Sequence, residues 1–110
     1  DCLLSRGLGD VYKRQVLRQC SREGDLAFRL GGEEFLLLLP DTSLAAATDV
    51  AERVRRLVEL TRIEPVGTVT ASLGVTLCPE AGHFADALRQ ADDLMYQAKQ
   101  AGRNRVMAAA

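Results

Sequence analysis

Residues 25–40 read DLAFRLGGEEFLLLLP, two short strand-like segments on either side of a glycine pair. The first segment alternates, which places Leu26 and Phe28 on one face of a strand. Because glycine adopts positive φ at little cost, Gly31-Gly32 predicts a tight hairpin turn. The second segment ends in a continuous apolar run, which indicates a strand buried on both faces and stopped by Pro40.

Two amphipathic helices are predicted downstream of this hairpin. N-cap side chains at residues 41–43 precede the first helix, whose apolar residues recur at spacings of three and four. Its apolar stripe is Leu44, Ala47, Ala51, Val54 and Val58, and its polar face carries Asp49, Glu52, Arg53 and Arg56. The stripe of the second helix is Phe84, Leu88, Ala91, Met95 and Ala98, with Gly102 as a C-cap.

A third strand is predicted between the two helices, at residues 68–76 (TVTASLGVT), which are rich in β-branched side chains. A short closing strand is predicted at residues 105–107. From Val16 onward, the expected order is therefore the end of a helix, two strands, a helix, a strand, a helix and a short strand. This order predicts an α+β fold in which helices flank a mixed sheet.

The composition describes one globular domain with no strong charge bias. The chain has 110 residues, 14 basic and 15 acidic side chains, and a net charge of −1. Such a balance argues against a surface that coats nucleic acid or a polybasic membrane anchor. The longest apolar run, Phe35–Leu39, is far shorter than the roughly 20 residues of a membrane span. We therefore expect neither nucleic acid nor the membrane as a direct partner.

Three cysteines, Cys2, Cys20 and Cys78, are spread along the chain without metal-site spacing. An odd count of dispersed cysteines indicates reduced thiols. His83 is the only histidine, so the sequence argues against a zinc site.

The first 15 residues, DCLLSRGLGDVYKRQ, show neither helical nor strand periodicity. They resemble translated adaptor sequence of the kind found at the ends of metagenomic reading frames. We therefore expect residues 1–15 to be non-native or disordered, with the native sequence starting near Val16. The alternative is an ordinary N-terminal arm or part of a helix.

The hairpin tip carries the chain's most chemically suggestive residues, the adjacent carboxylates Glu33 and Glu34. On a regular strand, neighbouring side chains point to opposite faces, so one carboxylate could ligate a hard cation while the other has a second role. Mg²⁺ commonly takes one or two protein carboxylates and fills its other positions with water and phosphate oxygens. On residue types alone, a solvated acidic surface turn remains the alternative.

Several ordered motifs together resemble the GGDEF family of diguanylate cyclases, in its GGEEF variant. The hairpin string RLGGEEF at residues 29–35 is followed by an apolar strand and Pro40-Asp41, as in that family. Residues 51–55 (AERVR), 69–75 (VTASLGV) and 91–104 (ADDLMYQAKQAGRN) resemble its next helix, strand and closing helix. The resemblance covers residues 16–107.

The resemblance implies a mostly antiparallel mixed sheet of the nucleotide-cyclase and polymerase-palm kind. It implies a transferase that condenses two GTP molecules to cyclic di-GMP and two pyrophosphates. The family acts as a homodimer, with one GTP per subunit and Mg²⁺ or Mn²⁺ as cofactor. We expect this domain to lie in the cytoplasm, also where the parent protein is anchored in a membrane.

The motif positions also imply residue roles. Glu33 is expected to be a metal ligand beside the attacking hydroxyl, and Glu34 the second catalytic carboxylate. Gly31 and Gly32 are expected to let the nucleotide approach closely. These four residues form the expected catalytic hairpin.

Lys99 and Arg103 match the cations that bind the triphosphate in the family. They are four residues apart, so they would be neighbours on a continuous helix. The alternative is that they only complement the dipole at the helix C-terminus.

A second site is implied by Arg22-x-x-Asp25, which resembles the family's inhibitory site for cyclic di-GMP. The planar guanidinium of arginine pairs with phosphates and stacks on bases, and a carboxylate accepts guanine N–H groups. Arg53 matches a further arginine of that site. The alternative is an ordinary loop salt bridge, worth under about 1 kcal/mol.

The family's first strand, with a metal-binding Asp, and its guanine-recognising residues have no match in this sequence. We therefore expect residues 16–110 to be the C-terminal part of a GGDEF domain that lacks its first strand and helix, and this fragment to be catalytically inactive. Two other classes stay open: a cyclic di-GMP receptor that does not make the nucleotide, and a dimerisation module.

Overall fold

The computed structural model describes residues 2–6, 10–31, 34–63, 67–68, 70–78 and 84–109. Three helices are present in this part of the chain: α1 (Asp10–Cys20), α2 (Leu44–Leu60) and α3 (Phe84–Gln100). The strands are β1 (Cys2–Arg6), β2 (Leu26–Gly31), β3 (Glu34–Leu38), β4 (Arg62–Ile63), β5 (Gly67–Thr68), β6 (Ser72–Thr76) and β7 (Val106–Ala108).

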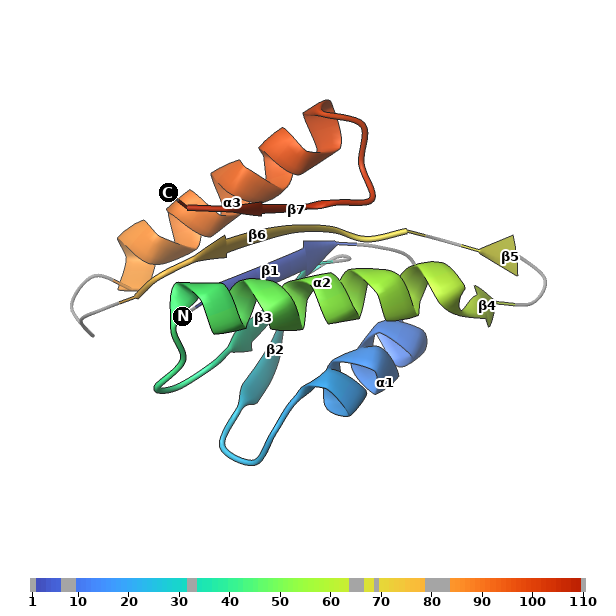
Figure 1. Ribbon diagram of the computed structural model, residues 1–110, viewed down its shortest axis with the longest axis horizontal. Coiled ribbons are helices and arrows are strands. Elements are labelled where there is room, and N and C mark those ends of the chain that lie inside the picture. The colour runs from blue at the N-terminus through green and yellow to red at the C-terminus, as the bar shows by residue number, and fades with distance from the viewer. Residues whose placement is uncertain are drawn as a thin grey trace.

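Five strands form one sheet in the order β2-β3-β1-β6-β7 (Figure 1). All neighbours are antiparallel except β6 and β7, which are parallel. The prediction of a mixed, mostly antiparallel sheet with flanking helices is confirmed. A separate two-stranded ribbon joins β4 to β5.

The helices form layers on the two faces of the sheet (Figure 1). The larger core cluster joins α1 and α2 to one face and includes Leu37, Leu39, Leu73 and Val75. The smaller cluster joins α3 to the other face and includes Leu36, with Leu38 packed against it. The apolar run of β3 thus feeds both cores alternately, as its sequence predicted.

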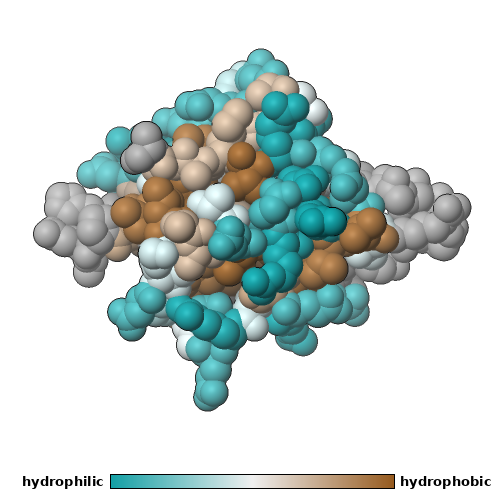
Figure 2. All heavy atoms as spheres, viewed as in Figure 1, coloured by the Kyte–Doolittle hydropathy of each residue, from teal (hydrophilic) through white to brown (hydrophobic). Residues whose placement is uncertain are grey.

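Helix α2 follows its predicted pattern closely. Ser43 is the N-cap, and its hydroxyl accepts a hydrogen bond of 3.1 Å from the Ala46 N–H. Four of the five residues of the predicted stripe are buried, and Leu44 is half-buried: Ala47, Ala51, Val54 and Val58 form the buried set. Figure 2 shows hydrophobic residues exposed between groups of hydrophilic residues on this face of the molecule.

Helix α3 lies almost in backbone contact with β6. A Cβ built on Gly74 would lie 2.5 Å from the Met95 nitrogen and would also collide with the Ala91 carbonyl oxygen. Glycine at this position therefore permits the close approach. Ala91, Met95 and Ala98 are buried as predicted, whereas Phe84, at the first position of the helix, is 38% exposed.

The N-terminal residues contribute a strand and the first turns of a helix. Residues 1–15 were expected to be non-native or disordered; in the structure, Cys2–Arg6 forms the central strand and α1 starts at Asp10. The strand position expected to be missing is therefore filled. The physical reason is that β3 and β6 hydrogen-bond β1 along both edges, which stabilises a strand without any alternation in its own sequence. The adaptor origin of residues 1–15 stays a prediction.

The strand predicted at residues 68–76 is shorter than expected. Its beginning belongs to the β4–β5 ribbon, and β6 covers only Ser72–Thr76. The closing strand is shifted by one residue from its predicted range of 105–107. None of the helices in the described ranges combines the length and apolar content needed to cross a bilayer.

Candidate functional sites at the two ends of the sheet

The turn between β2 and β3 lies at one end of the sheet. Gly31 pairs with Glu34 across the hairpin, and the register shifts between Arg29 and Gly31, which marks a bulge. Bulges redirect strand residues and are frequent beside active sites. Gly32 and Glu33 lie outside the described residues. The structure therefore places only the backbone of Gly31 and Glu34 from the predicted catalytic hairpin.

The end of α3 forms a Schellman motif. Gly102 has a φ of 126°, and its N–H donates to the Lys99 carbonyl at 3.3 Å. The Arg103 N–H donates to the Ala98 carbonyl at 2.9 Å. This pair of bonds is the signature of a glycine-terminated helix, so the predicted C-cap is confirmed. Lys99 lies in the last helical turn, whereas Arg103 lies in the turn beyond the helix.

The sheet register brings the hairpin and this turn to the same end of the sheet. Phe35, Ser5, Leu73 and Val106 form one row across four strands. Glu34 precedes the row on β3, and residues 101–105 precede it on β7. Three strand spacings separate them laterally, roughly 14 Å. Glu34 and the predicted phosphate-binding residues Lys99 and Arg103 therefore belong to one end of the molecule.

The carboxylates predicted to bind a metal ion at this end are those of the hairpin. Strand β1 has the sequence CLLSR, which contributes no carboxylate. Among the residues that the structure describes, no three His, Cys, Asp or Glu side chains come together as a metal site. Glu33 and Glu34 therefore remain the predicted metal-binding carboxylates, a pair that suits a cation held largely by water and substrate phosphates.

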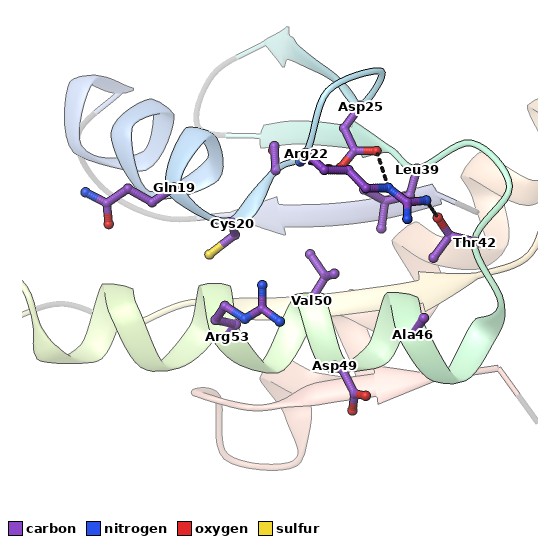
Figure 3. A pocket seen from close by; sticks show the side chains of 11 residues that line it. Gln19, Cys20, Arg22, Asp25, Leu39, Thr42, Ala46, Asp49, Val50 and Arg53 are labelled. Atoms are coloured by element: carbon purple, nitrogen blue, oxygen red, sulfur yellow. Dashed lines mark hydrogen bonds and ion pairs between the residues drawn. The ribbon is translucent and has the colours of Figure 1, made fainter.

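The opposite end of the sheet, where β2 begins, holds a pocket of about 350 Å³ (Figure 3). The pocket lies between the end of α1, the loop before β2 and the first half of α2. Arg22, Asp25 and Arg53, the three residues predicted for an inhibitory site, all line it. The structure thus brings Arg53 together with Arg22 and Asp25, which precede it by 31 and 28 residues.

Asp25 is the buried anionic group of the pocket. Its side chain is 3% exposed, and its Oδ2 accepts a hydrogen bond of 2.9 Å from the Arg22 N–H. Its Oδ1 lies 3.6 Å from the Arg22 Nε and accepts no hydrogen bond from the described residues. A buried carboxylate oxygen with unused acceptor capacity is uncommon and suits a ligand that donates N–H groups.

Arg22 connects two loops across the pocket mouth. Its Nη2 donates to the Pro40 carbonyl at 2.8 Å and to the Thr42 hydroxyl (Figure 3). The Thr42 hydroxyl in turn donates to Pro40 at 2.9 Å. These bonds hold the guanidinium in place although the side chain is 61% exposed.

Arg53 reaches toward the pocket from α2, opposite the end of α1 (Figure 3). Its charge lowers the pKa of the Cys20 thiol, but burial of that thiol is the larger effect and leaves the pKa raised. Two arginines and the buried Asp25 give the pocket groups for both phosphates and base edges.

Sequence reasoning missed several pocket residues, among them Cys20, Thr42 and Asp49. Thr42 was recognised only as an N-cap candidate. Its contact with Arg22 spans 20 residues and has no local sequence signal.

Comparison with known proteins identifies the family. A family model described as "Diguanylate cyclase, GGDEF domain" matches residues 11–105. Diguanylate cyclase DgcM of Escherichia coli K12 is 43% identical over 95 residues, which cover 86% of this chain and 23% of DgcM. The chain thus spans about a quarter of that relative's length.

Solved structures share the fold. Diguanylate cyclase SiaD of Pseudomonas aeruginosa, solved with its activator SiaC, superposes with a TM-score of 0.84 at 32% identity, covering 98% of this chain and 50% of SiaD. The GGDEF domain of DgcB from Caulobacter crescentus, solved with c-di-GMP, gives a TM-score of 0.79 at 24% identity, covering 97% and 77%. At that identity, the second likeness shows the fold alone.

The family match covers the GGEEF hairpin, the pocket lining and the turn after α3 in one continuous alignment. Its members have the names of nucleotide-condensing enzymes, a class that uses divalent metal ions. This chain belongs to the GGDEF family of diguanylate cyclase domains.

Proposed function

We propose that the chain is part of a diguanylate cyclase whose intact form condenses two GTP to cyclic di-GMP. The main support is the family match over residues 11–105. The β2–β3 hairpin and the turn that contains Arg103 also lie at the same end of the sheet. In each half-reaction, a 3′-hydroxyl oxygen forms a bond to an α-phosphorus of the other GTP. The bond from that phosphorus to the bridging oxygen breaks, and pyrophosphate leaves with its electron pair.

The chain's residues divide this work between the hairpin and the turn. Gly31 and Gly32 admit the nucleotide, and Glu34 acts as the second catalytic carboxylate near the attacking hydroxyl, whose proton must be removed. Lys99 and Arg103 neutralise the charge that develops on the leaving pyrophosphate. The two half-sites face each other in a homodimer, and the domain works in the cytoplasm, where GTP is available.

Glu33 is the proposed metal ligand, for Mg²⁺ or Mn²⁺. The metal, when bound, supplies charge neutralisation and polarises the hydroxyl. Because β1 adds no carboxylate, the donor set of this chain is smaller than the family resemblance implies. We therefore propose that the chain by itself turns over no GTP.

A chimera tests the proposal. Residues 16–107 replace the matching segment of DgcM, whose own upstream sequence then supplies the first strand. We expect cyclic di-GMP from GTP and Mg²⁺, and none from the same chimera with Glu33→Ala. A folded chimera that makes no more product than its E33A control contradicts the assignment. Turnover by the 110-residue chain itself contradicts its proposed inactivity.

A second candidate function, a cyclic di-GMP receptor, is favoured by the pocket. The pocket combines Arg22, Arg53 and the unsatisfied Oδ1 of Asp25, whereas the catalytic end lacks a carboxylate on β1. In the intact cyclase, the same pocket serves feedback inhibition. Calorimetric titration with cyclic di-GMP tests this function.

Arg53→Ala should weaken cyclic di-GMP binding about tenfold or more, because a charge-assisted contact to phosphate is lost. Arg56→Ala is the matched control, since Arg56 is exposed on the same helix and does not line the pocket. Equal affinities for both variants would remove Arg53 from the site. If neither the wild type nor the variants bind cyclic di-GMP, the receptor function is wrong and a dimerisation module is the better explanation.

A further inference from the structure

The turn that presents Arg103 has an unusual backbone. Arg103 and Asn104 are consecutive non-glycine residues with positive φ, 64° and 48°. Asparagine tolerates this left-handed region, but arginine adopts it rarely. Strained residues of this kind persist only where surrounding contacts fix them.

The Asn104 side chain supplies such contacts. Its Oδ1 accepts a hydrogen bond of 3.0 Å from the Arg55 Nη1, and its Nδ2 donates to the Glu59 Oε2. Both partners belong to α2, on the opposite face of the sheet from α3. Asn104 thus ties the turn after one helical layer to the other layer, around the β7 edge (Figure 1).

Arg55 is itself firmly held. Its side chain is 16% exposed, its Nε donates to the Glu52 Oε1 at 2.9 Å, and its Nη1 lies 3.6 Å from the Glu59 Oε1. The hydrogen bond from Arg55 lowers the pKa of the Glu52 carboxyl, so this pair stays charged at neutral pH. Asn104 therefore docks onto a preorganised carboxylate–guanidinium–carboxylate row.

The backbone on both sides of Asn104 is also anchored. The Arg103 N–H donates to Ala98 on α3, and the Arg105 carbonyl accepts from the Leu73 N–H on β6 at 3.0 Å. These bonds fix the two ends of the turn. The described contacts that join its middle to α2 are those of the Asn104 side chain.

We propose that Asn104 is a positioning residue, which, through Arg55 and Glu59, holds the left-handed turn in the conformation that presents Arg103. In this role it controls nucleotide affinity without touching the nucleotide. The effect on nucleotide affinity rests on the proposed function of Arg103. The effect on the conformation of the turn is inferred from the contacts of Asn104 alone.

Asn104→Gly is the sharpest variant, because glycine accepts a φ of 48° but removes both side-chain hydrogen bonds. We expect hydrogen exchange of the Arg103 amide to accelerate about tenfold or more. N104D keeps an acceptor for Arg55 but sets a carboxylate against Glu59, so exchange should accelerate here too. The double variant N104D/E59Q swaps the positions of the amide and the carboxylate and so restores a hydrogen bond between residues 59 and 104. The hydrogen-exchange rate of the Arg103 amide should then return toward the wild-type value.

The control is Arg89→Ala. Arg89 forms an exposed ion pair with Asp86 on α3, with N···O 3.7 Å, far along the helix from the turn. Its loss should leave Arg103 exchange unchanged. Unchanged exchange in N104G, or no rescue in N104D/E59Q, overturns the positioning role.

Binding of GTP with Mg²⁺ to the same variants separates the two proposals. Arg103→Ala and N104G should each weaken binding about tenfold, and N104D/E59Q should recover it. If R103A weakens binding and N104G does not, the positioning proposal fails. If R103A has no effect or wild type shows no binding, the proposed phosphate role of Arg103 fails, and the exchange rates still decide the conformational part.

Discussion

Asp25 has a buried carboxylate that is held in place by one oxygen and can still accept hydrogen bonds at the other. One carboxylate oxygen holds the Arg22 N–H, while the other is buried and accepts no hydrogen bond from the described residues. Leaving a buried acceptor unsatisfied costs about 1–3 kcal/mol. A guanine edge that donates to this oxygen would recover that free energy, which is a physical reason for a ligand to bind here.

The Cys20 thiol reports on the same pocket. Burial raises its pKa above the ordinary 9.0, and the charge of Arg53 offsets part of the rise. The thiol is therefore neutral at pH 8, and we expect iodoacetamide to modify it more slowly than in the urea-unfolded chain. The rate should climb only as the pH rises beyond 9, where the preference of the folded state for the neutral thiol also begins to reduce stability.

Peptide mass spectrometry measures this rate for Cys20 separately from the other cysteines. Arg53→Ala should slow the reaction further, because the nearby positive charge favours the thiolate, while Arg56→Ala should not. A Cys20 that reacts at pH 8 as fast in the folded as in the unfolded chain contradicts the described burial.

At the scale of elements, the contact between α3 and β6 positions the turn that we propose binds phosphate. The contact depends on Gly74, because any side chain there meets the backbone of Ala91 and Met95. The buried hydroxyl of Thr76 adds a hydrogen bond of 2.5 Å to the Gln90 Oε1 across the same interface. A shift of α3 would carry Lys99 and Arg103 with it.

Gly74→Ala should lower the free energy of unfolding by about 3 kcal/mol, since the clash is with backbone that cannot rotate away. Urea denaturation measures the change. Gly24→Ala is the control, because Gly24 has a φ of 95° but open space around its Cβ position. It should cost only the backbone strain, about 1 kcal/mol. Equal losses in the two variants would contradict the close helix–strand contact.

At the scale of the whole molecule, two elements join the two ends of the sheet. Strand β2 runs from Asp25 in the pocket to Gly31 at the hairpin. Helix α2 carries Arg53 into the pocket and, two residues later, Arg55 toward Asn104. A ligand in the pocket therefore contacts elements that also end at the proposed catalytic side.

Strand β1 is central to this architecture. Removing residues 1–9 would leave β3 and β6 without their shared partner and expose two rows of backbone hydrogen-bonding groups. We expect the shortened chain to lose cooperative thermal unfolding, as followed by circular dichroism. A truncated chain with an unchanged melting temperature would show that these residues do not support the sheet.

The sequence predicted what local patterns encode. The helical stripes, the Ser43 cap, the Gly102 C-cap and the two-faced β3 followed from periodicity and capping chemistry. The central strand did not, because residues 2–6 become a strand through partners on both edges rather than through their own alternation.

The candidate sites also depend on long-range contacts, which local sequence patterns do not predict. The grouping of Arg22, Asp25 and Arg53 was predicted from the family resemblance, and the structure brings them into one pocket. The contacts Arg22–Thr42 and Arg55–Asn104 join residues 20 and 49 positions apart, and no local pattern announces them.

A titration of the isotope-labelled chain with cyclic di-GMP, followed by its backbone amide NMR spectrum, tests directly whether this pocket binds the nucleotide. We expect saturable shifts concentrated in the segments 19–25 and 46–53, which contain most of the residues that line the pocket. The Arg56→Ala chain should reproduce them, and the Arg53→Ala chain should show them only at higher concentration. Shifts concentrated instead at residues 99–105, or no saturable shift at all, would contradict the assignment of this pocket.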